Sequence, residues 1–231
     1  MIALIRYQVS LLLRSHRWIP AAVIYVIGVV GLGGVGGSAT GHGAALPQGL
    51  SWSALMLVPS VAWLSRSVLT AEPPAARAVV AAAAGPRRAQ LAALAAAAGF
   101  AAVLGAAGLI WELVTSGVIR APHTNSVMIG ATFADVARGL GAALICLLVG
   151  SAIGAMCNPP VIRAPAASML ASTAAVVLAL VWSVSPANAA VRSGYGAATS
   201  SWPAGLPVIA ALALLVVAWS ISAVVAARRS S

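Results

Sequence analysis

Long apolar runs separated by short polar segments make up most of the 231-residue chain. A membrane-spanning helix needs about 20 predominantly apolar residues. Six segments meet or approach that length, namely residues 18–35, 50–69, 89–115, 136–157, 165–185 and 206–227. The pattern predicts an all-α membrane protein with six transmembrane helices, in which residues 1–231 form a single transmembrane domain.

A different pattern precedes the first apolar run. Residues 2–17 carry apolar and polar side chains on opposite faces of a helix, with Ile2, Ile5, Val9 and Leu12 on one face and Arg6, Ser10, Arg14 and Arg17 on the other. This amphipathic pattern predicts a helix that lies in the membrane interface. The alternative is a helical extension of the first span, but Pro20 favours a break between the two.

The segment between the second and third runs predicts a short helix over residues 74–85. Pro73 and Pro74 are suited to start it, and Glu72 precedes its positively polarised N-terminus. Residues 75–84 are rich in alanine and include Arg77, and Gly85-Pro86 stops the helix. Arg87 and Arg88 follow directly. A plain alternative role for these two arginines is binding to anionic lipids.

Composition excludes a soluble domain. Hydrophobic residues make up 61% of the chain, charged residues only 7%, and the mean hydropathy is +1.02. The net charge of +10 would suggest nucleic acid as the partner of a soluble chain. Here the basic residues lie between apolar runs and not along one face, so we expect contact with membrane lipids and no nucleic-acid partner.

The arginines also predict the orientation, because cytoplasmic loops of membrane proteins carry an excess of basic residues. If the N-terminus is cytoplasmic, the inner segments hold Arg6, Arg14, Arg17, Arg66, Arg77, Arg87, Arg88, Arg163, Arg228 and Arg229. The outer segments then hold only Arg120, Arg138 and Arg192. This asymmetry predicts that both termini are cytoplasmic, which requires an even number of spans.

Little in the sequence supports enzyme chemistry. The only acids are Glu72, Glu112 and Asp135. The glycines of residues 31–36 match a dinucleotide-binding pattern but lack the strand and helix that such a site needs, and no P-loop is present. We therefore expect no catalytic residues on this chain.

The few ionisable residues of the spans could have a functional or a structural role. Asp135 and Arg138 are spaced for an ion pair on one helix, and Glu112 has Arg120 as a candidate partner. Ionisable groups at membrane depth suggest a function, but these lie near span ends and could be structural. The histidines (His16, His42 and His123) and the two cysteines match no metal-ligand spacing, so no metal site is expected.

Two spans carry stripes of small and polar residues. The second span has Ser53, Met56, Ser60, Trp63 and Ser67, and the fifth has Ser168, Ser172, Ala175, Ala179 and Trp182. Such stripes usually indicate close helix packing. Lining of a substrate cavity, by Ser53, Met56, Ser60, Trp63, Ser172 and Trp182, is the alternative.

Three stretches together resemble a known family. They are residues 4–18 (LIRYQVSLLLRSHRW), 71–88 (AEPPAARAVVAAAAGPRR) and 149–164 (VGSAIGAMCNPPVIRA). They are similar to the interfacial "elbow" helix, the coupling-helix segment and the fourth-span end of ABC-2-type permease subunits of ABC transporters. The sequence departs from that family in showing no large external domain and no re-entrant helices before the sixth span, where residues 186–205 read as an outer loop.

The resemblance implies a function and partners. The chain would be a permease subunit of the bacterial plasma membrane that exports a hydrophobic or amphipathic substrate, such as a drug, antibiotic, lipid or peptide. It would pair with a second permease subunit and with a cytoplasmic ATPase, which alone would hold ATP and magnesium. Coupling would fall on Glu72, Arg77, Arg87 and Arg88, while Arg6, Arg14 and Arg17 would hold the elbow. The alternatives are a non-transport membrane subunit (an assembly factor or sensor) and an intramembrane lipid-modifying enzyme.

Overall fold

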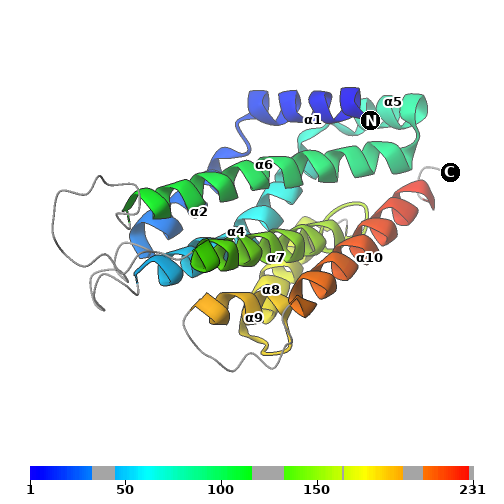
Figure 1. The fold of residues 1–231 in the computed structure, drawn as a ribbon. Helices are drawn as coiled ribbons and strands as arrows, with labels where there is room; N and C mark the ends of the chain where they lie inside the picture. Colours follow the sequence, from blue (N-terminus) through cyan, green and yellow to red (C-terminus); the bar gives the residue numbers. More distant parts are fainter. Residues whose placement is uncertain (33–44, 116–132, 163, 195–204, 229–231) are drawn as a thin grey trace, which may run out of the picture.

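The computed structural model describes residues 1–32, 45–115, 133–162, 164–194 and 205–228 (Figure 1). Within these ranges the chain is helical and contains no strand, so the all-α prediction is confirmed for the described part. The elements are α1 (Ile2–Ser15), α2 (Ile19–Ile27), the π-helical turn η1 (Gly28–Leu32), α4 (Ala45–Ala71), α5 (Pro74–Ala84), α6 (Pro86–Thr115), α7 (Phe133–Cys157), α8 (Pro165–Val181), α9 (Pro186–Gly194) and α10 (Leu206–Arg228).

Several of these helices could cross a membrane. Among the described residues, four are long and apolar enough by themselves, and these are α4, α6, α7 and α10. Helices α8 and α9 meet the same test together, but a bend of 48° separates them, which raises the number to five at most. The apolar helix over Ile19–Gly31 is shorter. The chain therefore has the helices of a multi-pass membrane protein.

The centre of the bundle is the contact between α4 and α7. These two are the most enclosed of the span-length helices, whereas α10 is mostly exposed on the surface of the isolated chain. Gly150 lets α7 approach the backbone of α4, because a Cβ atom there would lie 2.9 Å from the carbonyl oxygen of Val58. One turn later, a Cβ atom at Gly154 would overlap the side chain of Ser65. Small residues thus permit the close packing that spans rely on in lipid.

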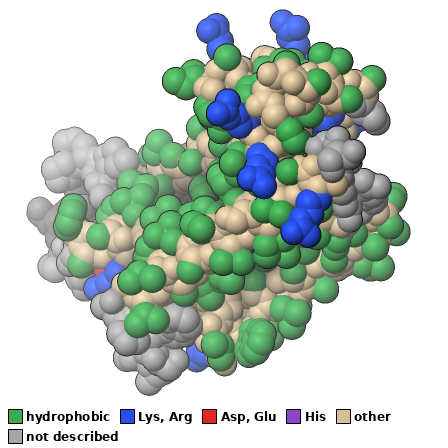
Figure 2. Space-filling model, turned by 90° about the vertical axis from the view of Figure 1, so that its right-hand side faces the viewer, with side chains coloured by type: hydrophobic (Ala, Val, Ile, Leu, Met, Phe, Trp, Pro, Cys, Tyr) green, Lys and Arg blue, Asp and Glu red, His purple; other side chains and the backbone are tan. Residues whose placement is uncertain are grey.

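The two ends of the bundle differ. Helix α5, the N-terminus and the end of α10 lie at one end, here named the α5 end, and α9 lies toward the other, here named the opposite end (Figure 1). Helix α1 lies alongside the first half of α6. Viewed from the α5 end, arginine side chains stand out among mostly hydrophobic neighbours (Figure 2). In the described part, Arg138 and Arg192 are the arginines of the opposite end.

The structure of residues 186–194 differs from the prediction made for them. We expected an outer loop, but Pro186–Gly194 forms α9, which packs against α4 and α7. Ala187, Ala190 and Val191 are buried there, and the side-chain amide of Asn188 donates to the carbonyl oxygen of Leu180 across the bend, at 2.5 Å. A short helix rich in small residues resembles a loop in composition, and only its burial distinguishes it.

We predict that Gly154→Ala destabilises the protein by about 1–3 kcal/mol, because the added methyl group must displace Ser65 of α4. Gly141→Ala is the matched control on α7, since a Cβ atom at Gly141 meets nothing within 4 Å. That control should be neutral or stabilising by about 0.5–1 kcal/mol, because alanine favours a helix interior. Unfolding in detergent micelles measures both, and equal stability of the two variants would contradict the close α4–α7 contact.

Candidate functional site

The turn between α4 and α5 centres on the carboxylate of Glu72. Pro73 is extended at the N-cap of α5, and Pro74 begins the helix. Glu72 is buried, and its carboxylate accepts hydrogen bonds from α1. The Tyr7 hydroxyl donates to one oxygen at 3.2 Å, and the Gln8 amide donates to the other at 3.4 Å. The residue predicted to precede the α5 N-terminus therefore joins α1 to the α4–α5 turn.

The surroundings of Tyr7 keep its hydroxyl protonated, so that it can donate a hydrogen bond to Glu72. Burial, and then the charge and the hydrogen bond of Glu72, raise the pKa of the Tyr7 hydroxyl. The protonated phenol is therefore favoured in the folded protein. The protonated Tyr7 hydroxyl therefore stabilises the folded protein at pH values below the ordinary tyrosine pKa. This stabilisation is lost as the pH rises through the higher pKa that Tyr7 has in the folded protein.

Two arginines satisfy carbonyl groups at the end of α4. Arg17, in the link between α1 and α2, donates to the carbonyl oxygen of Thr70 at 2.7 Å. Arg77 of α5 donates to the carbonyl oxygen of Leu69. The last carbonyls of a helix have no partner within it and carry its negative dipole end, so cations are favourable there. The expected coupling residue Arg77 and the expected elbow residue Arg17 thus cap the same helix.

A single residue links α5 to α6. Gly85 has a φ of 86°, and its N–H donates to the carbonyl oxygen of Ala81 at 2.9 Å. Arg87 and Arg88 are exposed in the first turn of α6. Arg6 and Arg14 are exposed on α1. The α5 end therefore presents these four side chains at its surface, while Glu72, Arg17 and Arg77 make contacts within it.

A second polar network at the α5 end was missed in the sequence. Arg66 of α4 donates to the hydroxyl of Ser168 on α8 at 2.6 Å, and that hydroxyl donates to the side-chain oxygen of Asn158 at 2.9 Å. The Asn158 amide donates to the carbonyl oxygen of Gly154 at 2.8 Å. Ser168 and Asn158 are buried, so the network fixes α8 to α4 and α7. In the sequence, the feature that could have indicated this network is Asn158, a polar residue at the end of an apolar run.

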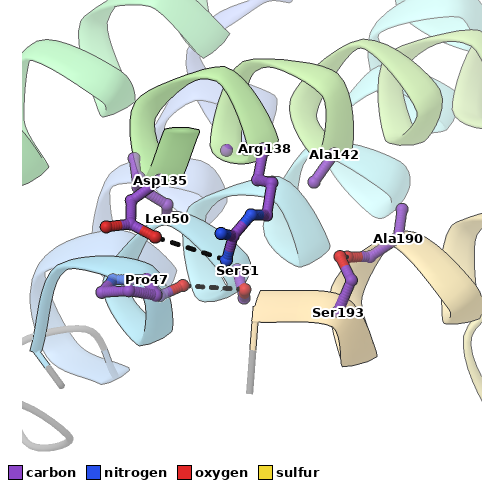
Figure 3. Close-up of a pocket in the computed structure, with 9 residues that line it drawn as sticks. Pro47, Leu50, Ser51, Asp135, Arg138, Ala142, Ala190 and Ser193 are labelled. Atoms are coloured by element: carbon purple, nitrogen blue, oxygen red, sulfur yellow. Dashed lines mark hydrogen bonds and ion pairs between the residues drawn. The ribbon is translucent and has the colours of Figure 1, made fainter. Parts of the chain in front are cut away.

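At the opposite end, the predicted pair on α7 is present. Arg138 contacts the Asp135 carboxylate at 3.3 Å. The pair borders a small cleft between α4, α7 and α9, which Ser51 and Ser193 also line (Figure 3). The Ser51 hydroxyl donates to the carbonyl oxygen of Pro47 at 2.8 Å. Glu112 is buried on α6. Its candidate partner Arg120 lies outside the described residues, as do Arg163, Arg229, His42 and His123.

The candidate cavity residues do not meet around this cleft, whose lining includes none of them. On α4 the hydroxyls of Ser53 and Ser60 are buried and donate to carbonyls of their own helix, Met56 is half-buried, and Trp63 is 41% exposed. On α8 the hydroxyl of Ser172 also bonds its own helix, and Trp182 is 62% exposed. Buried hydroxyls that bond their own helix favour the packing interpretation of the α4 stripe.

Comparisons of this chain with protein families, with curated proteins and with solved structures found no match.

We predict an energetic coupling between Gln8 and Glu72. Glu72→Ala leaves the buried Gln8 amide without its acceptor and should cost about 1–3 kcal/mol. In a double-mutant cycle with Gln8→Ala, the interaction energy should be about 0.5–3 kcal/mol. The cycle is measured by unfolding in detergent. Ser10→Ala, which removes an exposed bond within α1, should change stability by less than about 0.5 kcal/mol. A cycle that closes at zero would contradict the contact.

Proposed function

We propose that this chain is the permease subunit of an ATP-driven ABC transporter of the ABC-2 type, with both termini and α5 in the cytoplasm. It would export a hydrophobic or amphipathic substrate together with a second permease subunit. The observation that supports this most is the α4–α5 turn, where α1, α4 and α5 are joined by the contacts of Glu72, Arg17 and Arg77.

The outer surface of α5 is suited to contact a partner protein. Val79 is 69% exposed, and Ala78 and Ala82 are exposed beside it. Arg87 and Arg88 add a basic pair at the adjoining start of α6. A partner with a small apolar groove and acidic residues at its rim would complement this surface. In the proposal that partner is the cytoplasmic ATPase.

Movement of α5 would reach the spans because its connections are short. Only Glu72 and Pro73 separate α4 from α5, and only Gly85 separates α5 from α6. The hydrogen bonds of Glu72 and Arg77 further restrict the first connection. A displacement of α5 therefore moves the ends of α4 and α6, and α4 is packed against α7 at the centre of the bundle.

The chain itself supplies no nucleotide chemistry in this proposal. ATP and magnesium would bind the partner ATPase, and α5 would pass the resulting movement to the bundle. The second permease subunit would cover part of the exposed apolar surface. Helix α8 offers such a surface, with Leu170 and Val181 each 73% exposed. The substrate path would then lie between the two subunits, where Ser172 and Trp182 could line it.

We predict that the charge reversals Arg87→Glu and Arg88→Glu together weaken association with the proposed ATPase partner by about tenfold or more, which is about 1.4 kcal/mol. Both side chains are exposed, so folding should be unaffected. Arg192→Glu is the matched control, because Arg192 is also exposed but lies on α9 at the opposite end. The measurement is binding of the purified ATPase to the chain in nanodiscs, together with substrate transport.

Two results would contradict the proposal. If the unaltered chain binds no ATPase and supports no ATP-dependent transport, the function is wrong. If it does both, but the double reversal leaves binding and transport equal to those of Arg192→Glu, the arginines do not carry the coupling.

A further inference from the structure

Two buried side chains at the opposite end carry a polar atom that has no hydrogen-bond partner among the described residues. Glu112 of α6 is 6% exposed and Tyr25 of α2 is 2% exposed. Within the described part of the chain, neither the Glu112 Oε1 atom nor the Tyr25 hydroxyl makes a hydrogen bond. Buried polar atoms of native proteins are nearly always satisfied, so an unsatisfied pair requires an explanation.

Two glycines bring these groups close to their neighbours. A Cβ atom at Gly49 of α4 would overlap the Glu112 carboxylate, and a Cβ atom at Gly108 of α6 would overlap the Tyr25 hydroxyl. Gly108 and Glu112 are four residues apart, so they lie on one face of α6 about 6 Å apart along its axis. The carboxylate and the phenol therefore sit about one helical turn apart, enclosed between α2, α4 and α6.

No cation of the described residues neutralises Glu112. Helix α2 contributes only Tyr25 as a titratable group, and the half of α4 beside Gly49 contributes none. On α7, Asp135 and Arg138 contact each other. The charged and titratable groups that α1, α5 and α10 bring to α6 (Arg6, Tyr7, Arg14, Arg77 and Arg228) lie toward its start, and Glu112 is about 39 Å from that start along the axis. An ionised carboxylate here would be buried without compensation, at a cost of several kcal/mol.

We propose that Glu112 and Tyr25 form a proton-binding site, in which Glu112 holds the proton as a neutral carboxylic acid. The bound proton turns the unsatisfied Oε1 atom into a donor, and the Tyr25 hydroxyl oxygen, one helical turn away, is an unsatisfied acceptor. Loss of the proton to water regenerates the carboxylate, and the Tyr25 hydroxyl can then donate to it. The backbone of α4 at Gly49 lies directly against the carboxylate. This site is independent of the proposed transport function.

A hydrophobic carbodiimide tests the site directly, because it modifies protonated, buried carboxyl groups. The carboxyl proton moves to a carbodiimide nitrogen while the carboxyl oxygen bonds the central carbon, and an acyl shift to nitrogen gives a stable N-acylurea. The full chain in proteoliposomes is treated over a range from about pH 6 to about pH 9, and adducts are assigned by mass spectrometry. With only three acidic side chains in the sequence, Asp135 in its ion pair serves as the internal reference.

We expect the Glu112 adduct to be high at low pH and to fall about tenfold per pH unit above its midpoint, while the Asp135 adduct stays low over the whole range. Glu112→Gln should abolish the Glu112 adduct without unfolding the chain. Tyr25→Phe should move the midpoint upward, because the carboxylate loses a hydrogen-bond donor. Gly49→Ala should alter the profile by displacing the carboxylate, whereas Gly31→Ala, where a Cβ atom meets nothing within 4 Å, should not.

Three outcomes would overturn the proposal. A Glu112 adduct that equals the Asp135 adduct at every pH would show that the carboxyl is not held protonated. A midpoint unaffected by Tyr25→Phe would show that the phenol is not part of the site. Suppression of the adduct when sodium replaces choline at constant ionic strength would show that the site takes a metal cation instead of a proton.

Discussion

The hydrogen bonds that Glu72 accepts from Tyr7 and Gln8 determine how the α5 end is assembled. Without them, the turn between α4 and α5 would leave a carboxylate buried with no donor, which a low-dielectric surrounding makes costly. With them, α1 is attached to the same turn whose carbonyls Arg17 and Arg77 cap. The polar groups at the end of α4 are therefore satisfied by α1, by the link that follows α1 and by α5, none of which is predicted to span the membrane.

The sequence predicts elements better than contacts. Apolar runs locate the long helices because lipid demands about 20 such residues, and proline and glycine locate α5 within a residue or two. The hydrogen bond between Gln8 and Glu72 joins residues that are 64 positions apart in the sequence. The periodicity of apolar residues does not predict a contact between residues so far apart. The number of spans is also ambiguous from periodicity, because α9 has the composition of a loop and α2 is short.

The two polar ends of the bundle are connected by one helix. α6 runs without a break from Arg87 and Arg88 at the α5 end to Glu112 at the opposite end. The close approach of α4 at Gly49 encloses the Glu112 carboxylate near the far end of this helix. In these two separate proposals, a partner contacts α5 and the adjoining start of α6, whereas Glu112 binds its proton near the other end of the same helix.

We propose α5 as the surface that a cytoplasmic ATPase contacts. The most direct measurement places a cysteine at the exposed Val79, with Cys146 and Cys157 replaced by alanine, and follows its reaction with a membrane-impermeant maleimide in inverted membrane vesicles. The account predicts rapid labelling of the vesicles alone and strong protection once the ATPase is added. Labelling in intact cells, or a rate in the vesicles that the ATPase does not change, would contradict it.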